Sequence, residues 1–167
     1  ISCERCHGPG SRHVEFHRNN PDATDAMHII YPGNLPRLRK IEICAQCHSG
    51  VTVENIRPQF SYRPGEPLDE YKKLDHTSKE ARTGVHTANQ YARLSMSRCF
   101  TENDEITCIS CHDPHQNEHG NLALFSKRCL KCHEVAECRM AGEQSRHSSG
   151  MDCITCHMPK IADTATP

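Results

Sequence analysis

Cys108-Ile109-Ser110-Cys111-His112 is one of five copies of the motif Cys-x-x-Cys-His in this chain of 167 residues. The other four copies are Cys3–His7, Cys44–His48, Cys129–His133 and Cys153–His157. Two thiols at this spacing, followed directly by an imidazole, form the attachment signature of c-type haem. The thiols add to the vinyl groups of the porphyrin, and the histidine binds the iron as its proximal ligand. The sequence therefore predicts five covalently bound haem c groups, each with one iron.

Each motif assigns a role to three of its residues. The predicted thioether cysteines are Cys3, Cys6, Cys44, Cys47, Cys108, Cys111, Cys129, Cys132, Cys153 and Cys156. The predicted proximal ligands are His7, His48, His112, His133 and His157. A set of zinc modules, each with three ligands, would explain the cysteines but not the five trailing histidines.

The composition predicts an unusual core. Hydrophobic residues make up 35% of the chain, aromatic residues 5%, and tryptophan is absent, whereas soluble domains usually contain about 45–50% apolar residues. Side-chain burial alone would hardly offset the entropy lost on folding. We therefore expect a multihaem cytochrome c fold, mostly irregular with short α-helices and little or no β-sheet, around a stacked haem core. The apo-chain is then expected to be largely unfolded.

The spacing of the motifs suggests how the chain is organised. We expect residues 1–167 to form a single pentahaem module, with two haems in a sub-region 1–98 and three in a sub-region 99–167. Three prolines and a glycine in segment 56–67 predict an irregular connection. Its aromatic residues Phe60 and Tyr62 favour packing of this segment over a disordered hinge.

Few regular elements are expected. Residues 87–97 are the best helix candidate, because Tyr91 and Leu94 recur at helical spacing. Segments 69–74 and 122–131 are weaker candidates, and each haem motif should form one helical turn. We find no alternating strand pattern of any length.

Eight histidines remain outside the motifs, enough to give each of five irons a second histidine ligand. His115 is too close in sequence to His112 to reach the opposite face of the same porphyrin, so it should serve another haem. His13 follows a Gly-Pro-Gly turn after His7 and should also bind a neighbouring haem, and His86 and His147 are good candidates. The fifth distal ligand is one of His17, His28, His76 and His119.

Methionines are alternative axial ligands, and two cysteines lie outside the motifs. Methionine is the rival axial ligand, and the methionines near the motifs are Met96, Met140, Met151 and Met158. Cys99 and Cys138 lie outside the motifs, and in an oxidising compartment two such cysteines most often form a disulfide. The alternatives are two free thiols or a thiolate ligand to iron.

Charge and hydropathy restrict the partners and the location. The formal net charge is −1, with no basic cluster that would indicate nucleic acid. No stretch is apolar enough to be a transmembrane segment. Because haem is attached outside the cytoplasmic membrane, we expect a periplasmic or extracellular protein. Its secretion signal would have been removed, or the chain is a fragment of a longer protein.

Five segments resemble multihaem c-type cytochromes of the nitrifier tetrahaem cytochrome family and larger bacterial proteins that join such a module to helical repeats. They are residues 3–14, 62–68, 97–100, 107–115 and 152–160. The resemblance implies that His13, His86, His115 and His147 stand where distal ligands are found. It also implies that Cys99 and Cys138 stand at the positions of a structural pair.

These observations predict an electron carrier rather than an enzyme. Five low-spin, mostly bis-histidine haems would form a conduction chain, with redox proteins as partners. The chain would work alone or as a subunit of a homo-oligomer or an extracellular cytochrome filament. The alternative is a multihaem oxidoreductase of small nitrogen compounds such as nitrite, nitric oxide or hydroxylamine, which needs one open iron and nearby acid or base groups.

Overall fold

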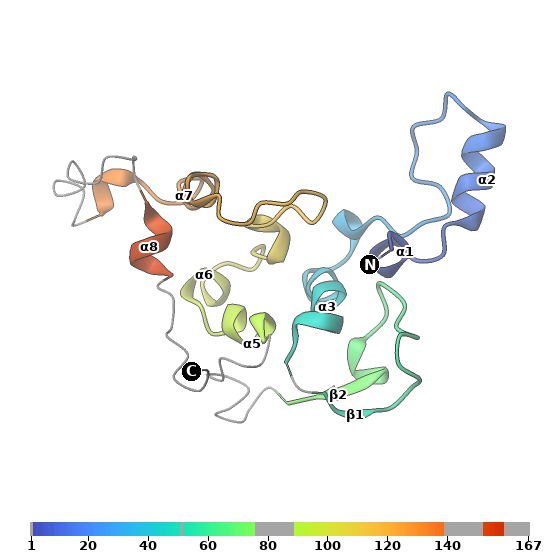
Figure 1. The fold of residues 1–167 in the computed structure, drawn as a ribbon, viewed down its shortest axis with the longest axis horizontal. Helices are drawn as coiled ribbons and strands as arrows, with labels where there is room; N and C mark the ends of the chain where they lie inside the picture. The colour runs from blue at the N-terminus through green and yellow to red at the C-terminus, as the bar shows by residue number, and fades with distance from the viewer. Residues whose placement is uncertain (1, 51, 76–88, 139–151, 159–167) are drawn as a thin grey trace. The chain divides into compact units, whose positions relative to one another are not determined.

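A computed structural model describes residues 2–50, 52–75, 89–138 and 152–158. The chain divides into two compact units, Ile1–Thr107 and Cys108–Pro167. The first unit carries the motifs that begin at Cys3 and Cys44, and the second carries the other three. Figure 1 shows the short helices and long irregular connections that make up the described chain.

The elements of the first unit are short. They are α1 (Glu4–His7), α2 (Ser11–Asn19), the 3-10 turn Pro32–Asn34, α3 (Arg37–His48), β1 (Thr52–Asn55), the 3-10 turn Leu68–Glu70, β2 (Lys72–Leu74), α5 (Gln90–Ser95) and α6 (Arg98–Thr101). Those of the second unit are the 3-10 turns Cys108–Ser110 and Val135–Glu137, and the helices α7 (Leu122–Cys129) and α8 (Cys153–His157). The predicted fold class is confirmed at this level: the described chain is mostly helical and irregular, with one small sheet.

Side-chain caps fix where four of the helices begin. The side-chain oxygens of Asn89, Ser97, Asn121 and Asp152 accept hydrogen bonds from backbone N–H groups in the first turns of α5, α6, α7 and α8, at 3.0–3.3 Å. Such caps satisfy backbone donors that the helix itself leaves unpaired. Local polar residues therefore start helices that are too short to be stable by themselves.

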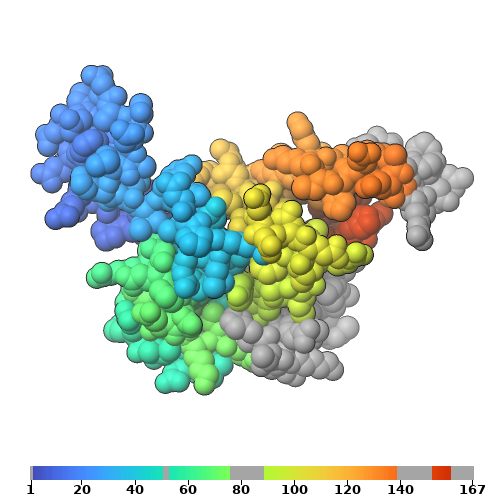
Figure 2. All heavy atoms as spheres, turned by 180° about the vertical axis from the view of Figure 1, so that it is seen from behind, coloured from blue at the N-terminus to red at the C-terminus, as the bar shows by residue number. Residues whose placement is uncertain are grey.

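The core of the first unit surrounds α3. Ala45 of this helix packs with Tyr62, Leu68 and Tyr71, whose two tyrosine rings meet edge to face with centroids 5.4 Å apart. Ile41 and Ile43 of α3 and Ala92 of α5 are also buried. Helix α3 contacts α5, and Figure 2 shows the segments of α3, the sheet and α5 next to one another. This unit thus has a small apolar core made of its own side chains.

A two-stranded antiparallel sheet lies beside this core. β1 pairs with β2 in the register Thr52 with Leu74 and Asn55 with Lys72. The expected helix at 69–74 is therefore wrong, because the chain forms a 3-10 turn at Leu68–Glu70 and then enters a strand. Pairing with a distant strand overrides the weak local preference.

The two aromatic residues of segment 56–67 behave differently. No helix or strand forms in this segment, as predicted. Tyr62 is buried, whereas Phe60 is 77% exposed and has a φ of 67°. The expectation that Phe60 packs into the core is wrong. Its ring instead contacts the guanidinium of Arg5, whose Cζ lies 5.0 Å from the ring centroid.

The described residues of the second unit, unlike those of the first, form no apolar core of side chains. Across its described residues, 108–138 and 152–158, the only buried side chain is that of Ser126, and no apolar side chain is buried. Secondary structure normally packs around an apolar core. The described protein side chains of this unit do not provide one.

Two further sequence expectations can be compared with the structure. The predicted helix at 122–131 is present as Leu122–Cys129, and that at 87–97 is present as Gln90–Ser95, with residues 87 and 88 outside the described residues. No helix within the described ranges has the length and apolarity to cross a bilayer.

Candidate haem-attachment sites

All five motifs form helical turns, as predicted. At Cys3, Cys108 and Cys129 the carbonyl of the first cysteine accepts hydrogen bonds from the backbone N–H groups of the last two motif residues, at 3.0–3.3 Å. The other two motifs lie within α3 and α8. Side chains at positions i, i+3 and i+4 of a helix share one side. Each turn therefore presents two thiols and an imidazole in the same direction.

These side chains lie at the surface of the protein. None of the ten motif cysteines, all within the described residues, is buried. His7 is half-buried, and His48, His112, His133 and His157 are exposed. The attachment groups are thus open to a large planar partner.

The first two motifs are joined by a direct hydrogen bond. Gln46, inside the second motif, donates from its side chain to the carbonyl of Arg5, inside the first, at 3.1 Å, and to the carbonyl of Ile43 at 2.7 Å. Burial, together with the nearby Cys47 thiol, raises the pKa of Cys6. The two motifs therefore lie side by side, with thiols close enough to interact.

In the second unit, α7 holds all three motifs. Arg128 donates to the carbonyl of Cys111 at 2.7 Å, and the Ser126 hydroxyl accepts from the backbone N–H of Cys153 at 3.0 Å. Cys129 is itself the last residue of α7. The His112 ring meets the Phe125 ring edge to face, with centroids 5.3 Å apart. One helix of eight residues thus sets the spacing of three attachment sites.

An ion pair fixes the loop that follows the third motif. Arg128 forms a two-pronged contact with the Glu118 carboxylate, and Glu118 also accepts from the backbone N–H of Asp113 at 3.1 Å. Both side chains are largely removed from solvent. The guanidinium, the backbone donor and the nearby His112 lower the pKa of Glu118 to about 2. The loop that carries His115 is therefore tied to α7.

We predict that this pair makes the second unit sensitive to acid. Because the pKa of Glu118 is lowered on folding, its contribution to stability is complete above the ordinary carboxyl pKa of about 4.5 and is lost as the pH falls towards 2. Thermal unfolding of the holoprotein from pH 6 to pH 2, compared with Glu118→Gln, should show a difference that shrinks over this window. A difference that stays constant down to pH 2 would contradict the prediction.

The predicted proximal histidine of the first motif donates a hydrogen bond from a defined nitrogen. His7 Nδ1 lies 2.9 Å from the carbonyl oxygen of Ile30, and the backbone N–H of Ile30 donates to the carbonyl of His7 at 2.8 Å. A carbonyl only accepts, so Nδ1 carries the hydrogen and Nε2 carries the lone pair. Metal-binding histidines are oriented in this way by a second hydrogen bond.

The same tautomer recurs at one predicted distal ligand. His13, on α2, places Nδ1 2.8 Å from the carbonyl oxygen of Met27. His115 is exposed, and its Nδ1 lies 3.6 Å from the Asp113 carboxylate. In both, Nε2 points away from the orienting group. His86 and His147 lie outside the described residues.

The structure describes three of the four candidates for the fifth distal ligand, and they differ in their hydrogen bonds and exposure. His17 uses Nε2, and not Nδ1, to approach the carbonyl oxygen of Asp25, at 3.1 Å. His28 is exposed and has a left-handed backbone with a φ of 62°. His119 is exposed, and its backbone N–H donates to Asn117 at 3.3 Å. His76 lies outside the described residues.

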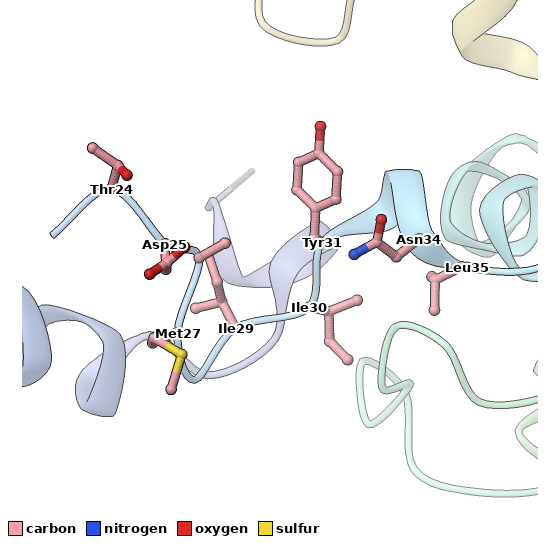
Figure 3. A pocket seen from close by; sticks show the side chains of 9 residues that line it. Thr24, Asp25, Met27, Ile29, Ile30, Tyr31, Asn34 and Leu35 are labelled. Carbon is pink, nitrogen blue, oxygen red and sulfur yellow. The ribbon is translucent and has the colours of Figure 1, made fainter.

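A hollow of about 600 Å³ adjoins the segment that orients His7 and His13. Its lining includes Met27, Ile29, Ile30, Tyr31 and Leu35. Figure 3 shows the side chains of Ile30 and Tyr31 on opposite sides of the segment. Met27 and Tyr31 are 43% and 57% exposed. Thr24, Asp25 and Asn34 also line the hollow, so polar groups accompany its apolar side chains.

Methionine ligation and zinc modules, the alternatives to bis-histidine haems, stay untested predictions. Within the described ranges, no group of three or more histidine, cysteine, aspartate or glutamate side chains is placed to hold a single metal ion. Met96 and Met158 are 42% and 69% exposed, and Met140 and Met151 lie outside the described residues.

The disulfide predicted between Cys99 and Cys138 stays a prediction. Cys99 is exposed and Cys138 is half-buried. We expect alkylation of the unreduced holoprotein to leave these two cysteines unmodified and alkylation after reduction to label both, as read by peptide mass spectrometry. Cys99→Ser should make Cys138 reactive without reduction. Labelling of Cys138 in the unreduced wild-type protein would contradict the pairing.

The polar residues that hold the motifs together were not predicted. Gln46 lies between the cysteines of its motif, and Arg128 directly precedes Cys129. Their positions in the sequence indicated only that these side chains lie close to a predicted haem-attachment motif. Nothing in the sequence indicated that each would reach the backbone of another motif.

Comparison with known proteins adds no relative, because no protein-family model, curated protein or solved structure matches this chain. The resemblance to multihaem cytochromes therefore stays a prediction from the motifs.

Proposed function

We propose that this chain is a pentahaem c-type cytochrome that transfers electrons between redox proteins. The observation that carries the proposal is the set of five Cys-x-x-Cys-His turns, each with its thiols and imidazole open at the surface. When bound, each haem supplies one iron that accepts and returns a single electron.

The interior of the protein supports this proposal. The second unit carries three motifs but buries no apolar side chain among its described residues. A small domain needs such a core, or a staple that replaces it. Large apolar groups attached at Cys108, Cys129 and Cys153 would serve as that core.

The residues of the chain set the geometry of electron transfer. Gln46 holds the first two motifs together, and α7 holds the other three. Such short links would keep neighbouring haems close within each unit. The Ile30 carbonyl makes the His7 imidazole present Nε2 to an iron, and the Asp113 carboxylate lies beside Nδ1 of His115. His7 would thus be oriented before a haem is bound, which would reduce rearrangement during electron transfer.

The proposed partners and location follow from this role. Redox proteins would dock near an exposed haem edge, and end-to-end assembly of copies into a filament would extend the conduction chain. Covalent attachment of haem would place the protein in the periplasm or outside the cell.

Low-temperature EPR of the oxidised protein, with haem quantified on the same sample, tests this function. We expect five haems per chain, all low-spin. Fewer than five haems would overturn the pentahaem assignment. A high-spin signal that shifts on addition of nitrite or hydroxylamine would instead support the oxidoreductase, because that reaction needs an open iron.

A further inference from the structure

We propose that His17 is not an iron ligand but a positioning residue, which holds the segment that orients the axial ligand His13. The inference rests on the proposed function. It removes one candidate for the fifth distal ligand and gives that residue another task.

His17 donates from a different ring nitrogen than His7 and His13 do. Its Nε2 lies 3.1 Å from the carbonyl oxygen of Asp25, so Nε2 is the donor and carries the hydrogen. His7 and His13 do the opposite and donate from Nδ1, at 2.9 and 2.8 Å. Of these three histidines, His7 and His13 keep the lone pair on Nε2, the nitrogen farther from the backbone, and His17 does not. His17 would have to break its hydrogen bond to offer that nitrogen to iron.

The hydrogen bond of His17 holds the Asp25 carbonyl, which has a second partner. The Asp25 carbonyl also accepts from the backbone N–H of Met27, at 2.8 Å. The carbonyl of Met27 is the acceptor for His13. His17 therefore fixes the start of a short chain of contacts that ends on the His13 imidazole.

The two imidazoles also touch directly. The rings of His13 and His17 meet edge to face, with centroids 4.5 Å apart. Both rings are half-buried, and they lie one turn apart on α2. The His13 ring is thus held at Nδ1 by Met27 and along its side by His17.

The backbone between the two acceptor carbonyls is strained. His28, between Met27 and Ile30, has a φ of 62°, a left-handed conformation that is unfavourable for a residue other than glycine. Such a conformation persists where the surrounding contacts impose it. Hydrogen bonds from His17 and His13 on one side and the paired bonds with His7 on the other impose it here.

Three substitutions in the holoprotein test the proposal. His17→Phe keeps the ring contact and removes the donor, His17→Gln keeps a donor near the position of Nε2, and His13→Ala removes the ligand. Haem content, EPR and the reduction potentials of each variant are compared with the wild type. Because α2 buries none of its residues, these changes should not prevent folding.

We expect all three variants to retain five haems. His17→Phe should stay fully low-spin but shift the EPR g-values and the reduction potential of one haem, and His17→Gln should restore both. His13→Ala should convert one haem to high-spin. If His17 were an iron ligand, both His17 variants would show a high-spin haem, and the proposal would fail. It would also fail if His17→Phe matched the wild type in both readouts.

These outcomes are separate from a failure of the proposed function. The wild-type protein alone reports the number of haems and their spin states. If it lacks five low-spin haems, electron transfer as proposed is wrong, whatever the His17 variants do. If it has them, the variants test only the role of His17.

Discussion

Replacing Cys129 and Cys132 by alanine should remove one haem and unfold most of the unit Cys108–Pro167. Among the described residues of this unit no apolar side chain is buried, so the porphyrins are expected to supply its core. Helix α7, which ends at Cys129, is also the element that holds the other two motifs of the unit. Limited proteolysis followed by mass spectrometry should show cleavage in this unit on the order of tenfold faster or more.

Two controls make this result specific. Lys131→Ala changes an exposed residue of the same motif and should keep five haems and wild-type proteolysis. Cys3→Ala with Cys6→Ala removes a haem from the first unit, whose core around Ala45 and Tyr71 is made of protein side chains and should persist. A second unit that remains resistant to protease after losing its haem would show that its stability does not depend on the cofactor.

The local parts of the fold were the parts that the sequence could predict. The turn at each motif follows from the spacing of residues that must meet one cofactor, and the helix at Leu122–Cys129 follows from its apolar residues and the Asn121 cap. Helix α2 was missed because its sequence is mostly polar and its two apolar residues, Val14 and Phe16, are not at helical spacing. The sheet was missed because strands of three and four residues, at Lys72–Leu74 and Thr52–Asn55, carry almost no periodic signal.

The site was predictable in its chemistry but not in its arrangement. Motif spacing assigned the thiols and the proximal histidines, and counting the remaining histidines led to bis-histidine ligation. Which nitrogen of His13 or His17 carries the hydrogen depends on carbonyls of Met27 and Asp25, which lie across a loop. Backbone carbonyls have no residue-type signature, so no sequence pattern reports them. The ligand candidates could therefore be counted from the sequence but only partly ranked.

The extent of the first unit also depends on a contact that is distant in sequence. The structure divides the chain after Thr107, so segment 99–107 belongs with the two-motif unit. Arg37, the first residue of α3, reaches this segment. It donates to the carbonyls of Phe100 at 2.8 Å and Ile106 at 3.0 Å, and its guanidinium lies 3.8 Å from the centroid of the Phe100 ring.

Arg37→Ala should therefore release segment 99–107 from α3 and cost about 3 kcal/mol. Because the Arg37 side chain is still 24% exposed, each of its two hydrogen bonds contributes about 1 kcal/mol, and the contact with the Phe100 ring adds roughly 0.5–1 kcal/mol. Hydrogen exchange of the holoprotein, read by mass spectrometry, should show the backbone amides of this segment exchanging on the order of 100-fold faster.

Two further variants separate the contributions to this effect. Arg37→Lys keeps the charge but loses the planar fork that reaches both carbonyls, so it should lose about half of the protection. Asp104→Ala removes only the fully exposed carboxylate that lies 3.5 Å from Arg37, and it should leave stability and exchange close to those of the wild type. If Asp104→Ala proved as damaging as Arg37→Ala, the ion pair and not the backbone contacts would hold the segment, because charge is the only interaction that the two variants remove in common.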